Sequence, residues 1–127
     1  GFELEEATQS SITVASAGTL ISINNKFCWN KSQRGAAILS REGSYVELYF
    51  NEFRNNIATL EGGAIHIASL VAEVIGSTFV ENEAKKGGGI YVVEGAAVGA
   101  MITRTRVVES TFAANSAEEN GASIFLN

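Results

Sequence analysis

Short hydrophobic segments alternate with polar turns along the whole chain, and the same pattern recurs at a nearly constant interval. Each copy has a phenylalanine, an asparagine three positions later, and a run of small residues that ends in isoleucine. The clearest copy is Phe53-Arg54-Asn55-Asn56 with Gly62-Gly63-Ala64-Ile65. The separation from phenylalanine to isoleucine hardly varies between the copies Phe27 to Ile38, Phe53 to Ile65, Phe79 to Ile90 and Phe112 to Ile124. Such regular spacing is typical of a repeat protein.

Within each copy the hydrophobic residues alternate with period two, as β-strands require. Segments of this kind are Ile12–Val14, Val46–Phe50, Ile65–Ile67, Ile90–Val92 and Ile124–Leu126. The copies lack both the i, i+3, i+4 stripe of a helical repeat and the strand motif of a leucine-rich repeat. We interpret each copy as about three short strands joined by turns. The predicted fold is therefore all-β, a single-stranded parallel β-helix of four to five coils, with a repeat of about 25–26 residues per coil.

The positions of the phenylalanines divide residues 1–127 into the coils of one β-helix segment. The expected coils are approximately 2–26, 27–52, 53–78, 79–111 and an incomplete 112–127. The fourth coil has an insertion near 94–102, because Ile90 and Phe112 lie further apart than the equivalent isoleucine and phenylalanine of the other coils. We expect the insertion to protrude as a loop, since the wall of stacked strands has no room for it.

Equivalent positions in successive coils should lie above one another at the strand spacing of about 4.7–4.9 Å. Two columns of identical residues are predicted. Inside the coils, phenylalanines should stack at Phe27, Phe53, Phe79 and Phe112. At a turn, amides should bond to the copies above and below at Asn30, Asn56, Asn82 and Asn115. We expect these asparagines to adopt the left-handed conformation, and the glycines before each isoleucine to form tight corners.

Candidate contact residues lie at one outward strand position and in the insertion. If the isoleucines of the repeat face inward, an apolar column faces outward, formed by Leu39, His66, Tyr91 and Phe125. This column is either a contact surface for another protein or a surface glycan, or simply cross-strand packing. The insertion is apolar, and its Val98 and Met101 either contact a partner or pack on their own coil.

Composition excludes several kinds of chemistry. A net charge of −5 with scattered lysines and arginines argues against a nucleic-acid partner. No apolar run is long enough to cross a bilayer, so no membrane span is expected in this segment. Cys28 is the sole cysteine, and all 14 acidic residues are glutamate. With one histidine and no aspartate, we predict no metal site, no other cofactor and no catalytic residues.

The combination of Phe-x-x-Asn with Gly-Gly-Ala-Ile resembles the repeats of the chlamydial polymorphic outer membrane proteins. The copies at Phe53 and Phe79 match fully or nearly so, whereas those with Gly35-Ala36-Ala37 and Gly121-Ala122-Ser123 depart at the second glycine. The resemblance implies a right-handed β-helix that serves as an autotransporter passenger and acts as a surface adhesin. It also implies a cell-surface or extracellular location, with any outer-membrane anchor in a region outside these residues.

Two functions remain as hypotheses. The first is a non-catalytic surface segment that acts in adhesion or as a structural scaffold. The alternative is a polysaccharide-binding or polysaccharide-cleaving β-helix of the pectate-lyase type. The absence of aspartate disfavours it. Glutamates could serve as the two carboxyls instead, but Glu47 and Glu73 fall at equivalent positions about one coil apart, where structural glutamates would also lie. Neither end of the sequence has a capping element. We therefore expect a window of a longer array, with flanking coils of the same chain as partners, or ends that stack on other chains.

Overall fold

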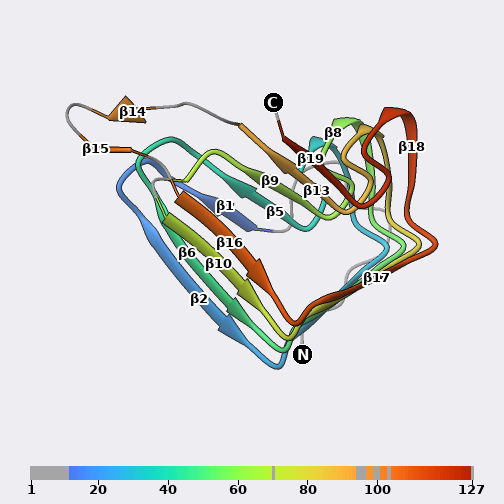
Figure 1. Ribbon diagram of the computed structural model, residues 1–127, viewed down its shortest axis with the longest axis horizontal. Coiled ribbons are helices and arrows are strands. Elements are labelled where there is room, and N and C mark those ends of the chain that lie inside the picture. The colour runs from blue at the N-terminus through green and yellow to red at the C-terminus, as the bar shows by residue number, and fades with distance from the viewer. Residues whose placement is uncertain (1–11, 70, 94–96, 99–100, 103, 127) are drawn as a thin grey trace.

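The computed structural model describes residues 12–69, 71–93, 97–98, 101–102 and 104–126. The described residues form β-strands and turns, and the strands make four parallel sheets that stack along one axis. Figure 1, a view down this axis, shows successive coils lying one behind another around a common core. The start of the first expected coil, residues 2–11, lies outside the described residues.

Each coil passes through the four sheets in the same order. The first sheet contains β1 (Ile12–Val14), β5 (Ile38–Ser40), β9 (Ile65–Ile67), β13 (Ile90–Val92) and β19 (Ile124–Leu126). The second sheet contains β2 (Thr19–Ile23), β6 (Tyr45–Tyr49), β10 (Val71–Ile75) and β16 (Arg104–Val108). The third sheet contains β3 (Lys26–Cys28), β7 (Glu52–Arg54), β11 (Thr78–Val80) and β17 (Thr111–Ala113). The fourth sheet contains β4 (Lys31–Arg34), β8 (Ile57–Glu61), β12 (Glu83–Lys86) and β18 (Ser116–Asn120).

The strand register confirms the predicted fold class, an all-β right-handed parallel β-helix. Phe53 lies opposite Phe27 and Phe79, as the repeat interval requires. The prediction of about three strands per coil is wrong, because each coil contributes one strand to each of four sheets. Two residues separate the third strand of a coil from the fourth, for example Trp29 and Asn30 between β3 and β4. These two residues form a corner between two strands.

The insertion in the fourth coil lies outside the parallel sheets. Its described residues form β14 (Ala97–Val98) and β15 (Met101–Ile102), a short antiparallel pair (Figure 1). Val98 lies opposite Met101 in this pair. The side chains of both residues lie outside the described part of the chain, so their contact with a partner stays a prediction.

A column of stacked phenylalanine rings fills the core beneath the third sheet. The ring centroids of Phe27 and Phe53 are 4.9 Å apart, those of Phe53 and Phe79 4.7 Å, and those of Phe79 and Phe112 4.6 Å. The planes of neighbouring rings differ by 5–8°. The coil spacing therefore sets the ring spacing, and each inner ring contacts a ring on both faces.

A column of asparagine amides closes the corner between the third and fourth sheets. Asn56 Nδ2 donates to Asn82 Oδ1 at 2.9 Å and to the Phe27 carbonyl at 3.0 Å. Its Oδ1 accepts from the backbone N–H and the Nδ2 of Asn30 at 3.1 and 2.9 Å. Asn82 repeats these bonds toward Asn115. The buried backbone groups of the corner thus gain partners without water.

The left-handed residue at this corner is the one before the ladder asparagine, so the predicted αL conformation of the ladder asparagines is wrong. The residues with positive φ are Trp29, Asn55, Glu81 and Ala114, at 60°, 55°, 54° and 54°. The other corner follows the prediction for glycine: Gly62 has φ +70°, and an added Cβ would collide with the Ile65 carbonyl oxygen. A side chain is therefore excluded at Gly62 by both conformation and space.

A second polar column at the corner between the second and third sheets was not predicted. Its members lie two positions before each core phenylalanine: Asn25, Asn51, Ser77 and Ser110. Each of the last three accepts a hydrogen bond from the backbone N–H of its counterpart one coil earlier, at 2.9–3.2 Å. The signal was present in the sequence, since this position is always asparagine or serine.

Candidate functional site

The predicted aromatic column lies on the outer face of the first sheet. Leu39, His66, Tyr91 and Phe125 occupy equivalent register positions. The His66 and Tyr91 rings stack at 5.1 Å, and the Tyr91 and Phe125 rings stack at 5.3 Å. The middle of this outward column is buried, since His66 is only 8% exposed and Tyr91 only 4%. Leu39 and Phe125 are partly exposed.

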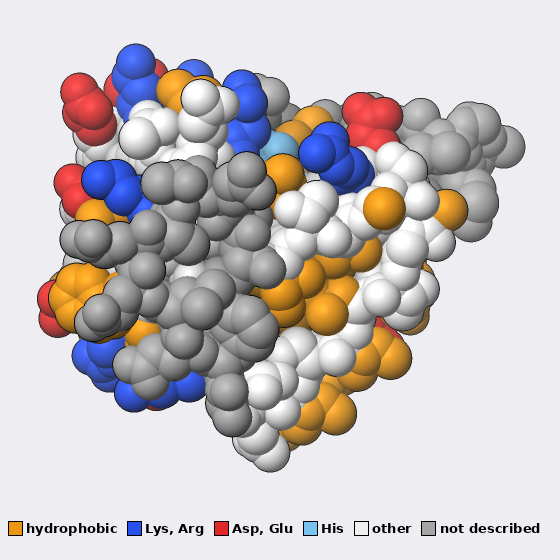
Figure 2. Space-filling model, turned by 180° about the vertical axis from the view of Figure 1, so that it is seen from behind, with side chains coloured by type: hydrophobic (Ala, Val, Ile, Leu, Met, Phe, Trp, Pro, Cys, Tyr) orange, Lys and Arg blue, Asp and Glu red, His pale blue; other side chains and the backbone are white. Residues whose placement is uncertain are grey.

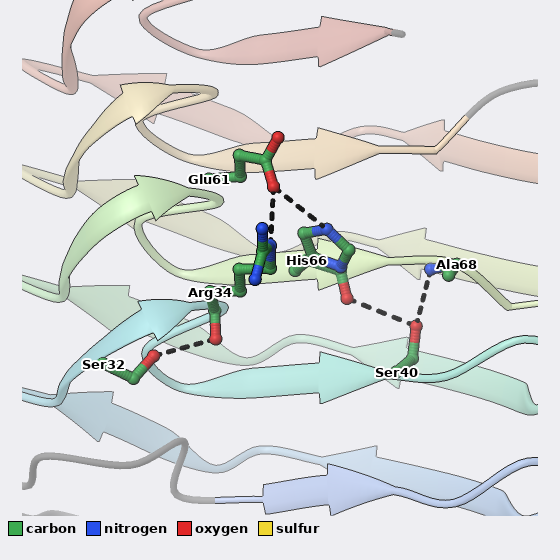
Figure 3. A network of polar contacts seen from close by, with 6 residues as sticks. All are labelled: Ser32, Arg34, Ser40, Glu61, His66 and Ala68. Atoms are coloured by element: carbon green, nitrogen blue, oxygen red, sulfur yellow. Dashed lines mark hydrogen bonds and ion pairs between the residues drawn. The ribbon is translucent and has the colours of Figure 1, made fainter.

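Charged side chains from the fourth sheet cover the buried part of this column. Arg34, Glu61 and Lys86 end successive strands at one register position, immediately before a glycine corner. Figure 3 shows Glu61 above Arg34 and His66, with the Arg34 Nε atom 2.8 Å and the His66 Nε2 atom 3.8 Å from Glu61 Oε1. The Lys86 ammonium lies 5.6 Å from the centroid of the Phe125 ring. The outer face of the first sheet therefore carries its own polar cover.

The ionisable groups on this outer face have pKa values that are shifted by burial and by their neighbours. Burial lowers the pKa of His66, and the Glu61 charge only partly opposes the effect. Burial raises the pKa of Glu61, but hydrogen bonds from Arg34 and Tyr91 more than reverse this, so the carboxyl stays ionised. Burial, together with the neighbouring Glu61, raises the pKa of the Tyr91 hydroxyl. The Nδ1 atom of His66 is buried and has no hydrogen-bond partner among the described residues, which suits a neutral ring.

We expect the chain to lose stability as the pH falls below about 6.5, and His66→Leu to remove part of that loss. Because the folded state lowers the pKa of His66, the unfolded chain takes up the proton first. The stability is present above the ordinary histidine pKa of 6.5 and declines below it. Leucine fits the position, since Leu39 occupies it in the preceding coil. Urea denaturation at pH 7.5 and pH 5.5 measures the effect, and an equal loss in both proteins would contradict it.

A groove of about 750 Å³ runs across the first coils beside this column. Thr13, Leu39 and His66 lie on its floor, which crosses β1, β5 and β9. One wall comes from β4 with Ser32, Gln33 and Arg34, and the other from the turn after β5 with Ser40, Arg41 and Glu42. In Figure 2 the sole histidine lies in a hollow with lysine or arginine side chains on either side. The groove is thus polar on its walls and partly apolar on its floor.

The turn that carries Arg41 is held by a network of serines. The Arg41 N–H donates to the Val14 carbonyl at 3.0 Å, and the Arg41 carbonyl accepts from the Ser44 hydroxyl at 2.7 Å. Ser44 Oγ in turn contacts Ser69 Oγ at 3.1 Å, and Ser69 Oγ contacts Ser40 Oγ at 2.7 Å. These bonds fix the backbone at the rim of the groove, so the exposed Arg41 side chain starts from a defined position.

Leu126, at the end of β19, is 62% exposed, and a group of other exposed apolar side chains lies on the outer face of the second sheet and at its corner. Ile21 is 57% exposed, Ile23 54% and Phe50 60%. Figure 2 shows hydrophobic side chains over the lower right of the molecule, where β2 runs. These residues were not predicted from the sequence because β2 has an inverted pattern, with Ser22 buried between two exposed isoleucines. Alignment of Ile21-Ser22-Ile23 with Glu47-Leu48-Tyr49 would have revealed it.

The two glutamates considered as a carboxyl pair lie on the same outer face. Glu47 and Glu73 are neighbours in register. Glu47 accepts a hydrogen bond from the Tyr49 hydroxyl at 2.9 Å, and Glu73 lies 3.8 Å from Arg106. Among the described residues no three His, Cys or Glu side chains gather as a metal site would require. That part of the chain also contains no helix able to cross a membrane.

Fold and surface together define a repeat-built β-helix with a polar groove on one outer face. Residues 52–68 and 76–93 match the family model of the Chlamydia polymorphic membrane protein repeat. The two adjacent coils around Phe53 and Phe79 therefore carry this repeat, as the resemblance in the sequence indicates. No curated protein and no solved structure matches the chain.

Proposed function

We infer that the chain is a non-catalytic segment of a surface-exposed β-helix that acts in adhesion. The observation that carries this proposal is the groove on the outer face of the first sheet, where stacked strands bring polar side chains from successive coils together. Rigid scaffolds with convergent polar groups are typical of binding sites. The two membrane-protein repeats support a location at the cell surface or outside the cell.

The alternative of a polysaccharide-cleaving enzyme has less support. Glycoside hydrolysis needs one carboxyl that donates a proton and a second that acts as base or nucleophile. Glu47 and Glu73 are bound to Tyr49 and Arg106 on a face away from the groove. Beside the groove, Glu61 is bound by Arg34. Glu42 is the sole carboxyl among the described residues that line the groove, so the lining does not contain the pair that hydrolysis needs.

Adhesion is tested with polystyrene beads coated with the chain and applied to cultured epithelial cells. We expect these beads to attach well above albumin-coated beads, and Gln33→Trp to reduce attachment to that background because the indole fills the groove. Thr19→Trp is the matched control, since Thr19 is exposed on the outer face of the second sheet. Attachment no better than albumin, or a Gln33→Trp variant that attaches like the original chain, would overturn the proposal.

A further inference from the structure

We propose that the groove binds a short acidic oligosaccharide, with its carboxylate or sulfate group held between Arg34 and Arg41. This inference rests on the proposed function and names the ligand of the same site. Both arginines line the groove, from opposite walls. A guanidinium group presents a planar set of donors that matches the paired oxygens of carboxylate or sulfate.

The two arginines differ in what holds them. Arg34 bonds to Glu61 at 2.8 Å, which fixes the direction of its guanidinium group. The Arg41 guanidinium forms no hydrogen bond or ion pair with any described residue. Its backbone, however, is held at both the N–H and the carbonyl. A ligand anion would therefore find an oriented cation on one wall and a cation with unused donors on the other.

The other lining groups match a sugar better than a peptide or a nucleic acid. Ser16 and Gln33 supply donors and acceptors for ring hydroxyls, and Leu39 offers an apolar floor for a ring face. The backbone of β5 is already paired on both sides with β1 and β9, so a peptide strand cannot add there. The net charge of −5 and the nearby Glu42 oppose a densely charged polyphosphate more strongly than a sugar that carries separate acidic groups.

The dimensions of the groove agree with this class of ligand. Its volume of about 750 Å³ lies within the range of roughly 300–1,000 Å³ that small-molecule sites occupy. It crosses three coils, from Thr13 through Leu39 to His66. Several sugar rings fit into such a space, and a single ion would leave most of it unfilled.

The test measures binding of three fluorescent oligosaccharides of equal length by anisotropy. A heparin tetrasaccharide carries sulfate, a tetragalacturonate carries only carboxylate, and maltotetraose is neutral. We expect one or both acidic probes to bind, with the preferred probe identifying the anion, and maltotetraose to bind at least tenfold more weakly. Arg41→Ala should weaken binding of the acidic probe by about tenfold or more, because a charge-assisted hydrogen bond is lost. Gln33→Ala should also weaken binding of the acidic probe, because it removes an uncharged polar group from the β4 wall of the groove.

Arg106→Ala is the matched control, because it removes the same charge from an exposed site on the second sheet. Equal weakening by Arg106→Ala and Arg41→Ala would overturn the proposal, as would equal binding of maltotetraose or no binding of any probe. The bead assay separates the two proposals. Beads that attach through the groove without binding acidic probes would overturn only the ligand class. Acidic probes that bind in an Arg41-dependent way while beads fail to attach would overturn only adhesion.

Discussion

Phe53→Ala is expected to lower the free energy of unfolding by about 3–5 kcal/mol, as large-to-small changes at buried aromatic positions do. Phe53 is fully buried, and its ring stacks on Phe27 at 4.9 Å and on Phe79 at 4.7 Å. The cavity left by the ring cannot collapse easily, because backbone hydrogen bonds between coils hold the strands at their spacing. The loss is a large fraction of the roughly 5–15 kcal/mol that stabilises an ordinary domain.

Two further variants distinguish the effect of losing a stacked core ring from the effect of losing any phenylalanine. Phe50→Ala removes a ring that is 60% exposed and should change stability by less than about 0.5 kcal/mol. Phe112→Ala removes a partly buried ring with one described stacking partner, Phe79, and should have an intermediate effect. Urea denaturation followed by circular dichroism measures all three. Similar losses for Phe50→Ala and Phe53→Ala would show that stacking in the column does not stabilise the chain.

The fold class could be predicted from the sequence because, in stacked coils, residues that are one repeat apart lie opposite each other in the sheets. Phe27, Phe53 and Phe79 recur at a constant interval and lie opposite one another in the third sheet. The number of strands per coil could not be predicted in the same way. The corner between the third and fourth sheets is turned by a residue whose type varies from Trp29 to Ala114. The asparagine that follows it marks a turn, but nothing in its recurrence shows that a further strand begins at the very next residue.

The candidate site was only partly predictable, because its shape depends on side chains from several strands. Alternation places His66 and Tyr91 on the outer face, but it contains no information about Glu61, which comes from β8 and lies 3.8 Å from His66. The groove likewise joins Arg34 and Arg41, which are near in sequence but lie on two walls. Their relation follows from the glycine corner at Gly35, where φ is +53°, and from the turn that follows β5.

Asn56→Ala is expected to destabilise the chain by about 3 kcal/mol, because one substitution breaks hydrogen bonds to three neighbours. Asn56 is fully buried. Its Nδ2 donates to Asn82 Oδ1 and to the Phe27 carbonyl, and its Oδ1 accepts both Asn30 donors. Because Asn30 and Asn82 are buried as well, the groups that lose these bonds stay desolvated. The cost therefore exceeds that of a single hydrogen bond exchanged with water.

Asn120→Ala serves as the control, because Asn120 is exposed at the end of β18 and should contribute less than about 0.5 kcal/mol. Asn115→Ala tests whether the effect depends on burial within the asparagine column. The Asn115 amide bonds to Asn82 and to the Phe79 carbonyl, but Asn115 is only partly buried. A graded series, with Asn56 above Asn115 and Asn115 above Asn120, would show that the amides stabilise the stack through their bonds between coils. Equal effects at Asn56 and Asn120 would instead assign the stability of the corner to its backbone pairing and the phenylalanine column alone.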